Sequence, residues 1–202
     1  MYSKQYKDFE FYYLTELTKQ KIKPLSRIEK QIGRKEIRWL KKQGLFVDTI
    51  SRKTLNGNQI IETIFSTSSR YIQFYRNKFE KSLLFKNCDE MKIEGFLFGY
   101  PSCCVHQFIQ KPYKSNHLPQ IDQSLLFHWA CPDCRVTPEL IPYYQSIYKS
   151  VKGWYDSEIQ TKNTLSTNYK RNFQTAIAAA MLTAGLVSAQ TPVDTTHYIP
   201  LP

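Results

Sequence analysis

Glycine is scarce in this chain, at 7 of 202 residues. Neither G-x-G-x-x-G nor G-x-x-x-x-G-K-[ST] occurs, so the two common glycine-rich loops that cradle nucleotide phosphates are missing. A Ser-His-Asp order and a paired-carboxylate motif are missing too. The sequence therefore does not indicate a nucleotide-dependent enzyme or a hydrolase.

The first ten residues lack the apolar core of a secretory signal peptide, because Met1 to Glu10 is polar and aromatic. We therefore expect a cytoplasmic protein whose cysteines stay reduced. In that compartment a group of cysteines indicates a metal or redox site before it indicates disulfides.

Positive charge is concentrated in one stretch. The net charge is +11, and residues 19–53 hold twelve Lys or Arg against three acidic residues, a balance of +9. Such a field predicts an anionic partner, either nucleic acid or an anionic membrane surface, although a merely solvated face has the same composition.

The same region has the pattern of a winged helix-turn-helix. Apolar spacing predicts a helix over residues 5–19, and Ser26 with Glu29 forms a capping box that predicts a second helix from Arg27. A basic helix follows over residues 34–43. Asn56-Gly57 then predicts a hairpin between strands 47–54 and 59–67.

This order resembles a winged-helix unit over residues 24–67, within a basic segment 20–68. The resemblance implies that residues 34–43 form a recognition helix. Small winged-helix units also dock proteins, so a protein partner stays open. The side chains expected to face phosphates or bases are Arg34, Lys35, Arg38, Lys41 and Lys42.

Two cysteine motifs carry the strongest signal. Cys103 and Cys104 are adjacent, and Cys131 and Cys134 form a Cys-x-x-Cys pair 27 residues later. A Cys-x-x-Cys turn brings two thiolates to one ion, and zinc or a 4Fe-4S cluster then needs two further ligands. Pro101 predicts a helix that starts near Ser102 and places Cys103 and Cys104 in its first turn, where the helix dipole favours thiolate.

Several ligand sets remain open. All four cysteines would make a Cys₄ site, whereas His128 with three of them would make Cys₃His. A dithiol redox site or a catalytic thiol without metal is a further alternative. Cys88 has no partner at motif spacing, and we expect it to be a core residue.

The two motifs also carry a family resemblance. The segments Gly99–Cys104 (GYPSCC) and His128–Cys134 (HWACPDC) resemble the signature of an uncharacterised archaeal and bacterial family, the domain-of-unknown-function family numbered 483, over residues 72–150. The resemblance implies no settled activity, only that Cys103, Cys104, Cys131 and Cys134 bind metal.

A short string keeps RNA modification open. Residues 111–117 (KPYKSNH) are similar to a Lys-Pro-Tyr-x-Ser-x-x-His motif of archaeosine synthases, which modify tRNA. In that family a Pro-Cys precedes the lysine at shorter spacing, whereas Cys104 lies seven residues before Lys111 here. The resemblance implies an RNA-modifying enzyme in which Lys111, Ser115 and His117 face the substrate. In that alternative an iron–sulfur centre or the reactive thiols of Cys103 and Cys104 would carry out redox or RNA-modifying chemistry.

Near the end, the uncharged segment from Phe173 to Ala189 follows Lys170 and Arg171. Seventeen such residues are at the lower limit for a membrane span. We expect an apolar helix over residues 172–189 that packs on the protein, anchors it to a membrane as an adaptor or acts as an internal signal, and an extended tail over residues 190–202.

Together these features predict a mainly α protein. An N-terminal helix (1–19) and a winged-helix-like unit with one β-hairpin (20–68) precede a helical four-cysteine domain (70–155). In and before that domain, apolar spacing predicts a helix over residues 70–86, and Thr137 followed by Pro138 predicts the N-cap of a further helix. The leading function is a metal-binding protein, with zinc or a 4Fe-4S cluster, whose basic unit contacts nucleic acid or another acidic partner.

Overall fold

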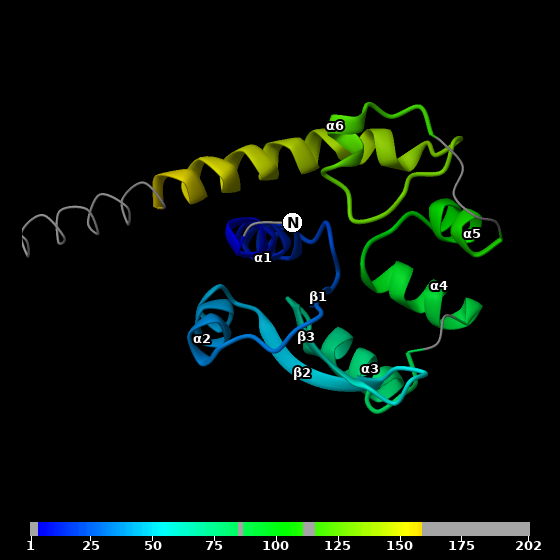
Figure 1. The fold of residues 1–202 in the computed structure, drawn as a ribbon. Coiled ribbons are helices and arrows are strands. Elements are labelled where there is room, and N and C mark those ends of the chain that lie inside the picture. The colour runs from blue at the N-terminus through cyan, green and yellow to red at the C-terminus, as the bar shows by residue number, and fades with distance from the viewer. Residues whose placement is uncertain (1–3, 85–86, 111–115, 159–202) are drawn as a thin grey trace, which may run out of the picture. The chain divides into compact units, whose positions relative to one another are not determined.

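The computed structural model describes residues 4–84, 87–110 and 116–158 (Figure 1). Contacts divide the chain into two units, residues 1–154 and residues 155–202. The first unit is mainly helical with one small antiparallel sheet, as predicted. The elements, in chain order, are α1 (Lys4–Lys19), β1 (Ser26–Ile28), α2 (Arg34–Lys42), β2 (Phe46–Lys53), β3 (Gln59–Ser66), α3 (Ser69–Phe79), α4 (Cys88–Leu97), α5 (Ser102–Gln110) and α6 (Gln120–Gln123). Residues 136–158 are also helical.

The predicted first helix, basic helix and hairpin are confirmed as α1, α2 and the β2–β3 pair. The hairpin turn differs in detail from the prediction. Gly57 takes a positive φ of 80° and donates its backbone N–H to Thr54 O at 2.9 Å, whereas Asn56 has no positive φ. The turn thus needs glycine at one position, not left-handed backbone at two.

The predicted helix from Arg27 is wrong, because residues 26–28 form the strand β1. Ser26 pairs with Phe65 of β3, which gives the sheet the order β1-β3-β2. The Ser26 hydroxyl lies 2.7 Å from that of Thr18 on α1, so it does not cap a helix. Backbone pairing with β3 therefore outweighs the local preference of residues 26–29 for a capped helix.

Two further helix boundaries differ from the sequence prediction. The helix expected over residues 70–86 ends at Phe79, because Lys81 takes a φ of 61° and the chain turns back to place Leu83 beside Lys53 of β2. The last helix, expected to start with Thr137 as its N-cap, is already helical at residue 136. Thr137 thus lies within that helix and does not cap it.

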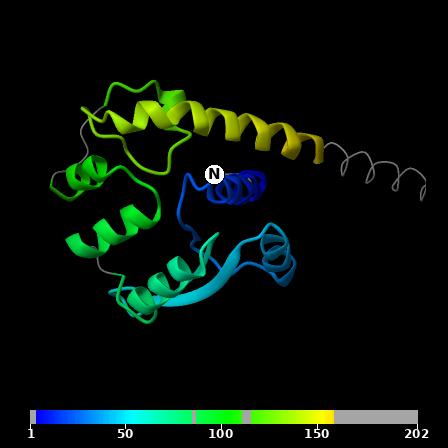
Figure 2. The same ribbon diagram turned by 180° about the vertical axis from the view of Figure 1, so that it is seen from behind.

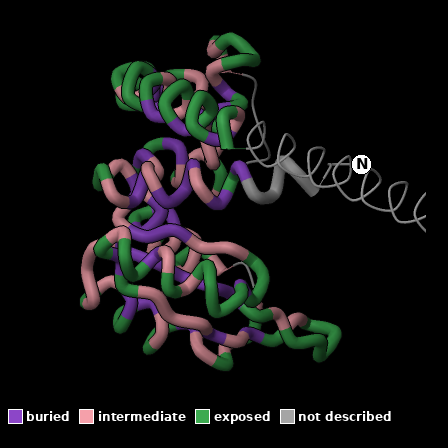
Figure 3. Tube along the Cα trace, turned by 90° about the vertical axis from the view of Figure 1, so that its left-hand side faces the viewer, coloured by how far each residue is buried: buried purple, intermediate pink, exposed green. Residues whose placement is uncertain are grey.

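The sheet is covered on both faces by clusters of buried apolar side chains. Buried residues are purple in Figure 3. Neighbouring residues of β3 point to opposite faces, and Phe65 packs with Leu14 of α1 and Leu40 of α2. Ile64 packs on the other face with Tyr75 of α3, which lies across β2 and β3 (Figure 2). The rest of this second cluster comprises Leu25, Ile50, Ile72, Phe79, Leu97 and Phe98.

Glycines set the path from α4 to α5. A Cβ at Gly95 would collide with Val105 of α5, so glycine permits the close approach of the two helices. Gly99, with a φ of 72°, brings the chain against the backbone of Ile22 and Lys23. These two close approaches position the start of α5, which holds Cys103 and Cys104, relative to α4 and to the α1–β1 connection.

The expected membrane association is corrected. Within the described residues no helix is long and apolar enough to cross a membrane. Phe173 to Ala189 lies outside them, as do the predicted tail 190–202 and residues 111–115 of the archaeosine-synthase-like string.

Candidate metal centre

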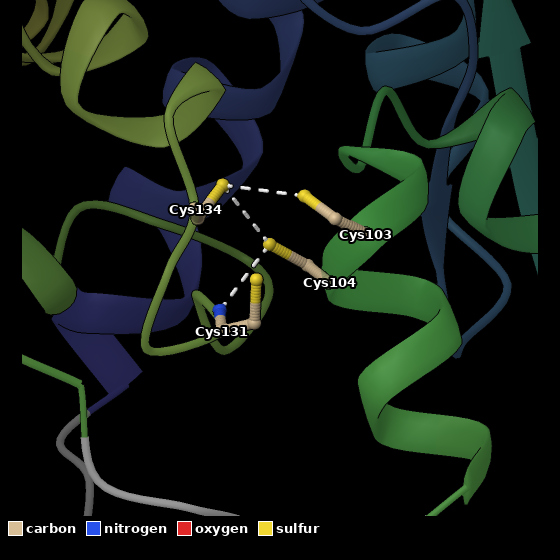
Figure 4. A group of neighbouring side chains, drawn as sticks. All are labelled: Cys103, Cys104, Cys131 and Cys134. Carbon is tan, nitrogen blue, oxygen red and sulfur yellow. Dashed lines mark hydrogen bonds between the residues drawn. The ribbon is translucent and has the colours of Figure 1, made fainter.

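Two segments bring the four predicted cysteines together (Figure 4). Cys103 and Cys104 lie in the first turn of α5, as the sequence predicted. Cys131 and Cys134 lie on the loop before the helix at 136–158, in a tight turn in which the Cys134 N–H donates to Cys131 O at 3.1 Å. The four Sγ atoms lie within 4.8 Å of one another, which is close enough to hold a metal ion.

Cys134 contacts both of the adjacent cysteines. Its Sγ lies 3.6 Å from Cys103 Sγ and 3.4 Å from Cys104 Sγ, so both adjacent cysteines reach the same point. Cys104 Sγ also accepts the Cys131 backbone N–H at 3.3 Å. Cys104 and Cys134 are buried, Cys131 is half-buried and Cys103 is exposed, so the group opens to solvent on one side only.

His128 lies outside this four-sulfur group. Its ring rests against that of Tyr100, with centroids 5.1 Å apart, and its Nε2 lies 3.2 Å from Thr137 Oγ1. Burial, followed by the nearby charge of Lys23, lowers the pKa of His128 to about 4. The ring is therefore neutral at physiological pH and contacts the cysteines through Thr137.

Thr137 is a site residue that the sequence pattern assigned to helix capping instead. Its side chain is fully buried, its hydroxyl lies 3.1 Å from Cys134 Sγ, and its backbone N–H donates to the same sulfur at 3.3 Å. The hydroxyl also lies 3.8 Å from Cys104 Sγ. The three-residue spacing from Cys134 is the signal that could have identified it.

These contacts divide the thiols by acidity. The expectation that the start of α5 favours thiolate at Cys103 and Cys104 is wrong for the metal-free protein. Burial raises the pKa of Cys103 to about 11 and also raises that of Cys104, and hydrogen bonding to Cys134 adds to both shifts. Burial acts the same way on Cys134, but its hydrogen bonds with the Thr137 hydroxyl and backbone N–H, together with those to Cys104 and Cys103, outweigh burial and lower the pKa of Cys134 to about 7. In the metal-free protein the first thiolate therefore forms on Cys134.

Side-chain amides hold the loop that carries Cys131. Asn116 donates to Ala130 O at 3.0 Å and to Gln123 Oε1 at 2.9 Å, and Gln123 donates to His128 O at 2.8 Å. Nothing in the sequence pattern identified these amides, because single Asn and Gln residues in a loop have no characteristic spacing. They fix the loop on either side of the first cysteine of the pair.

The basic residues predicted to meet nucleic acid all lie on α2 and all are exposed. Among the described residues none of the five, Arg34, Lys35, Arg38, Lys41 and Lys42, takes part in an ion pair.

Other members of the basic stretch point inward. Lys23 and Arg52 are 2% exposed. Arg27 and Arg52 share Glu94 Oε1, each at 2.8 Å, and both also pair with the buried Glu62. Fewer basic residues are therefore available to a partner than the sequence of residues 19–53 suggests. Arg27 and Arg52 instead connect the sheet to α4 through their ion pairs.

No protein-family model matches the chain, and no significant match is found among curated proteins or solved structures. The resemblance to the family numbered 483 and the resemblance to winged-helix proteins therefore stay predictions.

Proposed function

We propose that Cys103, Cys104, Cys131 and Cys134 bind one structural zinc ion. The observation that carries this proposal is the mutual distance of the four sulfurs, all within 4.8 Å. Tetrahedral zinc with bonds of about 2.3 Å places its sulfurs about 3.8 Å apart. In a 4Fe-4S cluster each thiolate binds a different iron atom, so the four sulfurs would lie farther apart.

Four protein ligands also favour a structural role. A catalytic zinc keeps one position open for water or substrate, whereas four thiolates fill the coordination sphere. The ion would join the first turn of α5 to the loop before residue 136, a loop that the amides of Asn116 and Gln123 brace internally.

Elemental analysis and an absorption spectrum of anaerobically purified protein test the zinc site. We expect about one zinc per chain, no visible absorption, and a tetrahedral thiolate spectrum after replacement by cobalt. Cys131→Ser/Cys134→Ser should lose the ion. Cys88→Ser is the matched control, because Cys88 lies outside the group and is exposed, not in the core as the sequence predicted.

Iron with sulfide in the same sample would contradict the zinc proposal and favour the iron–sulfur enzyme. Absence of metal from both the parent protein and the Cys131→Ser/Cys134→Ser variant would leave a dithiol site in its place.

We further propose that α2 and the β2–β3 hairpin bind nucleic acid in the manner of a winged helix. The order α1, β1, α2, β2, β3 and the sheet order β1-β3-β2 support the likeness, with a strand and loop where a further helix was expected. Helix α2 has nine residues, and five of them are exposed basic side chains that form no ion pair with the described residues. Such a helix is suited to contacts with phosphates.

Fluorescence anisotropy with a labelled random-sequence DNA duplex tests this second role. Lys35→Gln/Arg38→Gln/Lys41→Gln should weaken binding about tenfold or more and lower the salt slope by roughly one per lost phosphate contact. The matched control is Arg70→Gln/Lys78→Gln/Lys149→Gln, which removes the same charge from exposed positions elsewhere. Equal losses in both triple variants would show only a net-charge effect and would contradict the assignment to α2.

A further inference from the structure

A second site of the molecule lies apart from the cysteines and from α2. A cavity of about 380 Å³ opens between α1, β1 and the segment around residue 98. This volume is within the range of small-ligand sites, about 300–1,000 Å³. Its lining comprises Glu10, Phe11, Leu14, Lys23, Arg27, Ile28, Glu29, Lys30, Phe98, Tyr100 and Phe127.

Lys23 is the unusual residue of this lining, because it is 2% exposed. Its ammonium donates to Phe98 O at 2.7 Å. It also lies over two further rings of the cavity wall, 4.7 Å from the centroid of Tyr100 and 5.0 Å from that of Phe127. The amine therefore stands among aromatic faces inside the cavity.

The amine lacks an anionic partner within the described part of the protein. None of the ion pairs among the described residues includes Lys23. The neighbouring Arg27 is already paired with Glu29, Glu62 and Glu94. One backbone carbonyl and the faces of aromatic rings offset only part of the free-energy cost of burying an ammonium group. Burial is the larger cause, and the charge of Arg27 the smaller one, of a Lys23 pKa that is lowered to about 7.

We propose that this cavity binds a small organic anion, a carboxylate or phosphate ester carried on a flat apolar ring, with the anionic group on the Lys23 ammonium and the ring against Tyr100 and Phe127. A bound anion would provide the negative partner that the Lys23 ammonium lacks among the described residues. The aromatic lining suits a planar ring, and the exposed Glu10, Glu29 and Lys30 mark the mouth. The site needs neither the zinc ion nor nucleic acid.

Isothermal titration of the full-length protein with phenyl phosphate and benzoate tests the proposal. Benzyl alcohol, which has the ring without the charge, and inorganic phosphate, which has the charge without the ring, are the controls. We expect measurable binding of the two aromatic anions and at least tenfold weaker binding of both controls. Equal binding of benzyl alcohol, or no binding of either aromatic anion, would overturn the proposal.

Variants separate the charge from the ring. Lys23→Met keeps the length and burial of the side chain and should weaken phenyl phosphate at least tenfold, whereas Lys53→Met, at an exposed position on β2, should leave it unchanged. Tyr100→Leu keeps the amine and should weaken phenyl phosphate more than inorganic phosphate.

Thermal unfolding tests whether each variant is folded. If Lys23→Met does not fold, the comparison of phenyl phosphate with inorganic phosphate in Tyr100→Leu tests the proposal instead. Unchanged phenyl phosphate affinity in a folded Lys23→Met protein, or equal losses of both ligands in Tyr100→Leu, would place the anion elsewhere.

Discussion

At the residue scale, the Thr137 hydroxyl contributes to the acidity of Cys134. It lies 3.1 Å from Cys134 Sγ, and with the Thr137 backbone N–H and the thiols of Cys104 and Cys103 it lowers the pKa of Cys134 to about 7. The same hydroxyl lies 3.2 Å from His128 Nε2, so it links the neutral ring to the sulfur. Residues that orient a metal ligand in this way tune affinity although they do not touch the ion.

Replacing Thr137 by valine should weaken zinc about tenfold at neutral pH, because the variant loses one hydrogen bond to the Cys134 thiolate and keeps the other. Competition with a chromophoric chelator measures the affinity. Thr137→Ser retains the hydroxyl and should bind as the parent does. If Thr137→Val binds zinc as tightly as the parent protein, the Thr137 backbone N–H alone is enough to stabilise the Cys134 thiolate.

Zinc binding should also depend steeply on pH. The pKa values of Cys103 and Cys104 are raised in the metal-free protein, so both thiols are protonated near neutral pH and must release their protons to bind the ion. Apparent affinity should therefore rise with pH, by about a hundredfold per unit for these two protons, and fall as pH decreases. Chelator competition between pH 6 and 8 measures this slope, and a flat profile would argue against thiolate ligation.

At the scale of the elements, Gly99 fixes the turn between α4 and α5. Its φ of 72° is in the left-handed region, and a Cβ would meet Ile22 O and the Lys23 backbone. The turn thus aligns the start of α5 with the α1–β1 connection, and it cannot relax without moving Cys103 and Cys104.

Gly99→Ala should destabilise the protein by about 2 kcal/mol, since it adds both backbone strain and a steric clash. Denaturant unfolding monitored by circular dichroism measures the change. Gly153→Ala is a fitting control, because Gly153 is helical and a Cβ there meets nothing within 4 Å, so that variant should be neutral or slightly more stable. Equal stability of both variants would contradict the close approach at Gly99.

At the scale of the whole unit, the cysteine group lies outside the two apolar clusters that cover the faces of the sheet. Cys104 and Cys134 pack with Ala130 in a small cluster of their own, whereas the sheet is enclosed by residues of α1 to α4. Stability in such an arrangement is uneven, and the segments with few apolar contacts open first.

Chelation of zinc should therefore loosen the cysteine segments more than the sheet. Hydrogen exchange with and without chelator should show lost protection in residues 102–110 and 116–135, and little change in β2 and β3. The apparent melting temperature should fall as well. Uniform loss of protection across residues 4–154 would mean that the ion supports the entire unit.

Local patterns were enough to predict α1, α2, the β2–β3 hairpin, the helix start at Ser102 and the four cysteines that converge. Each depends on neighbours within a few residues, through helical periodicity, turn chemistry or the Cys-x-x-Cys spacing. The strand at Ser26–Ile28, the end of α3 at Phe79 and the burial of Arg52 depend on partners far along the chain. Thr137 lies only three residues from Cys134, but its N-cap pattern gave no sign that its hydroxyl would contact a sulfur. A capping box or an N-cap signal states only a local preference, and long-range strand pairing, ion pairs with Glu62 and hydrogen bonds to sulfur outweigh it once the chain is folded.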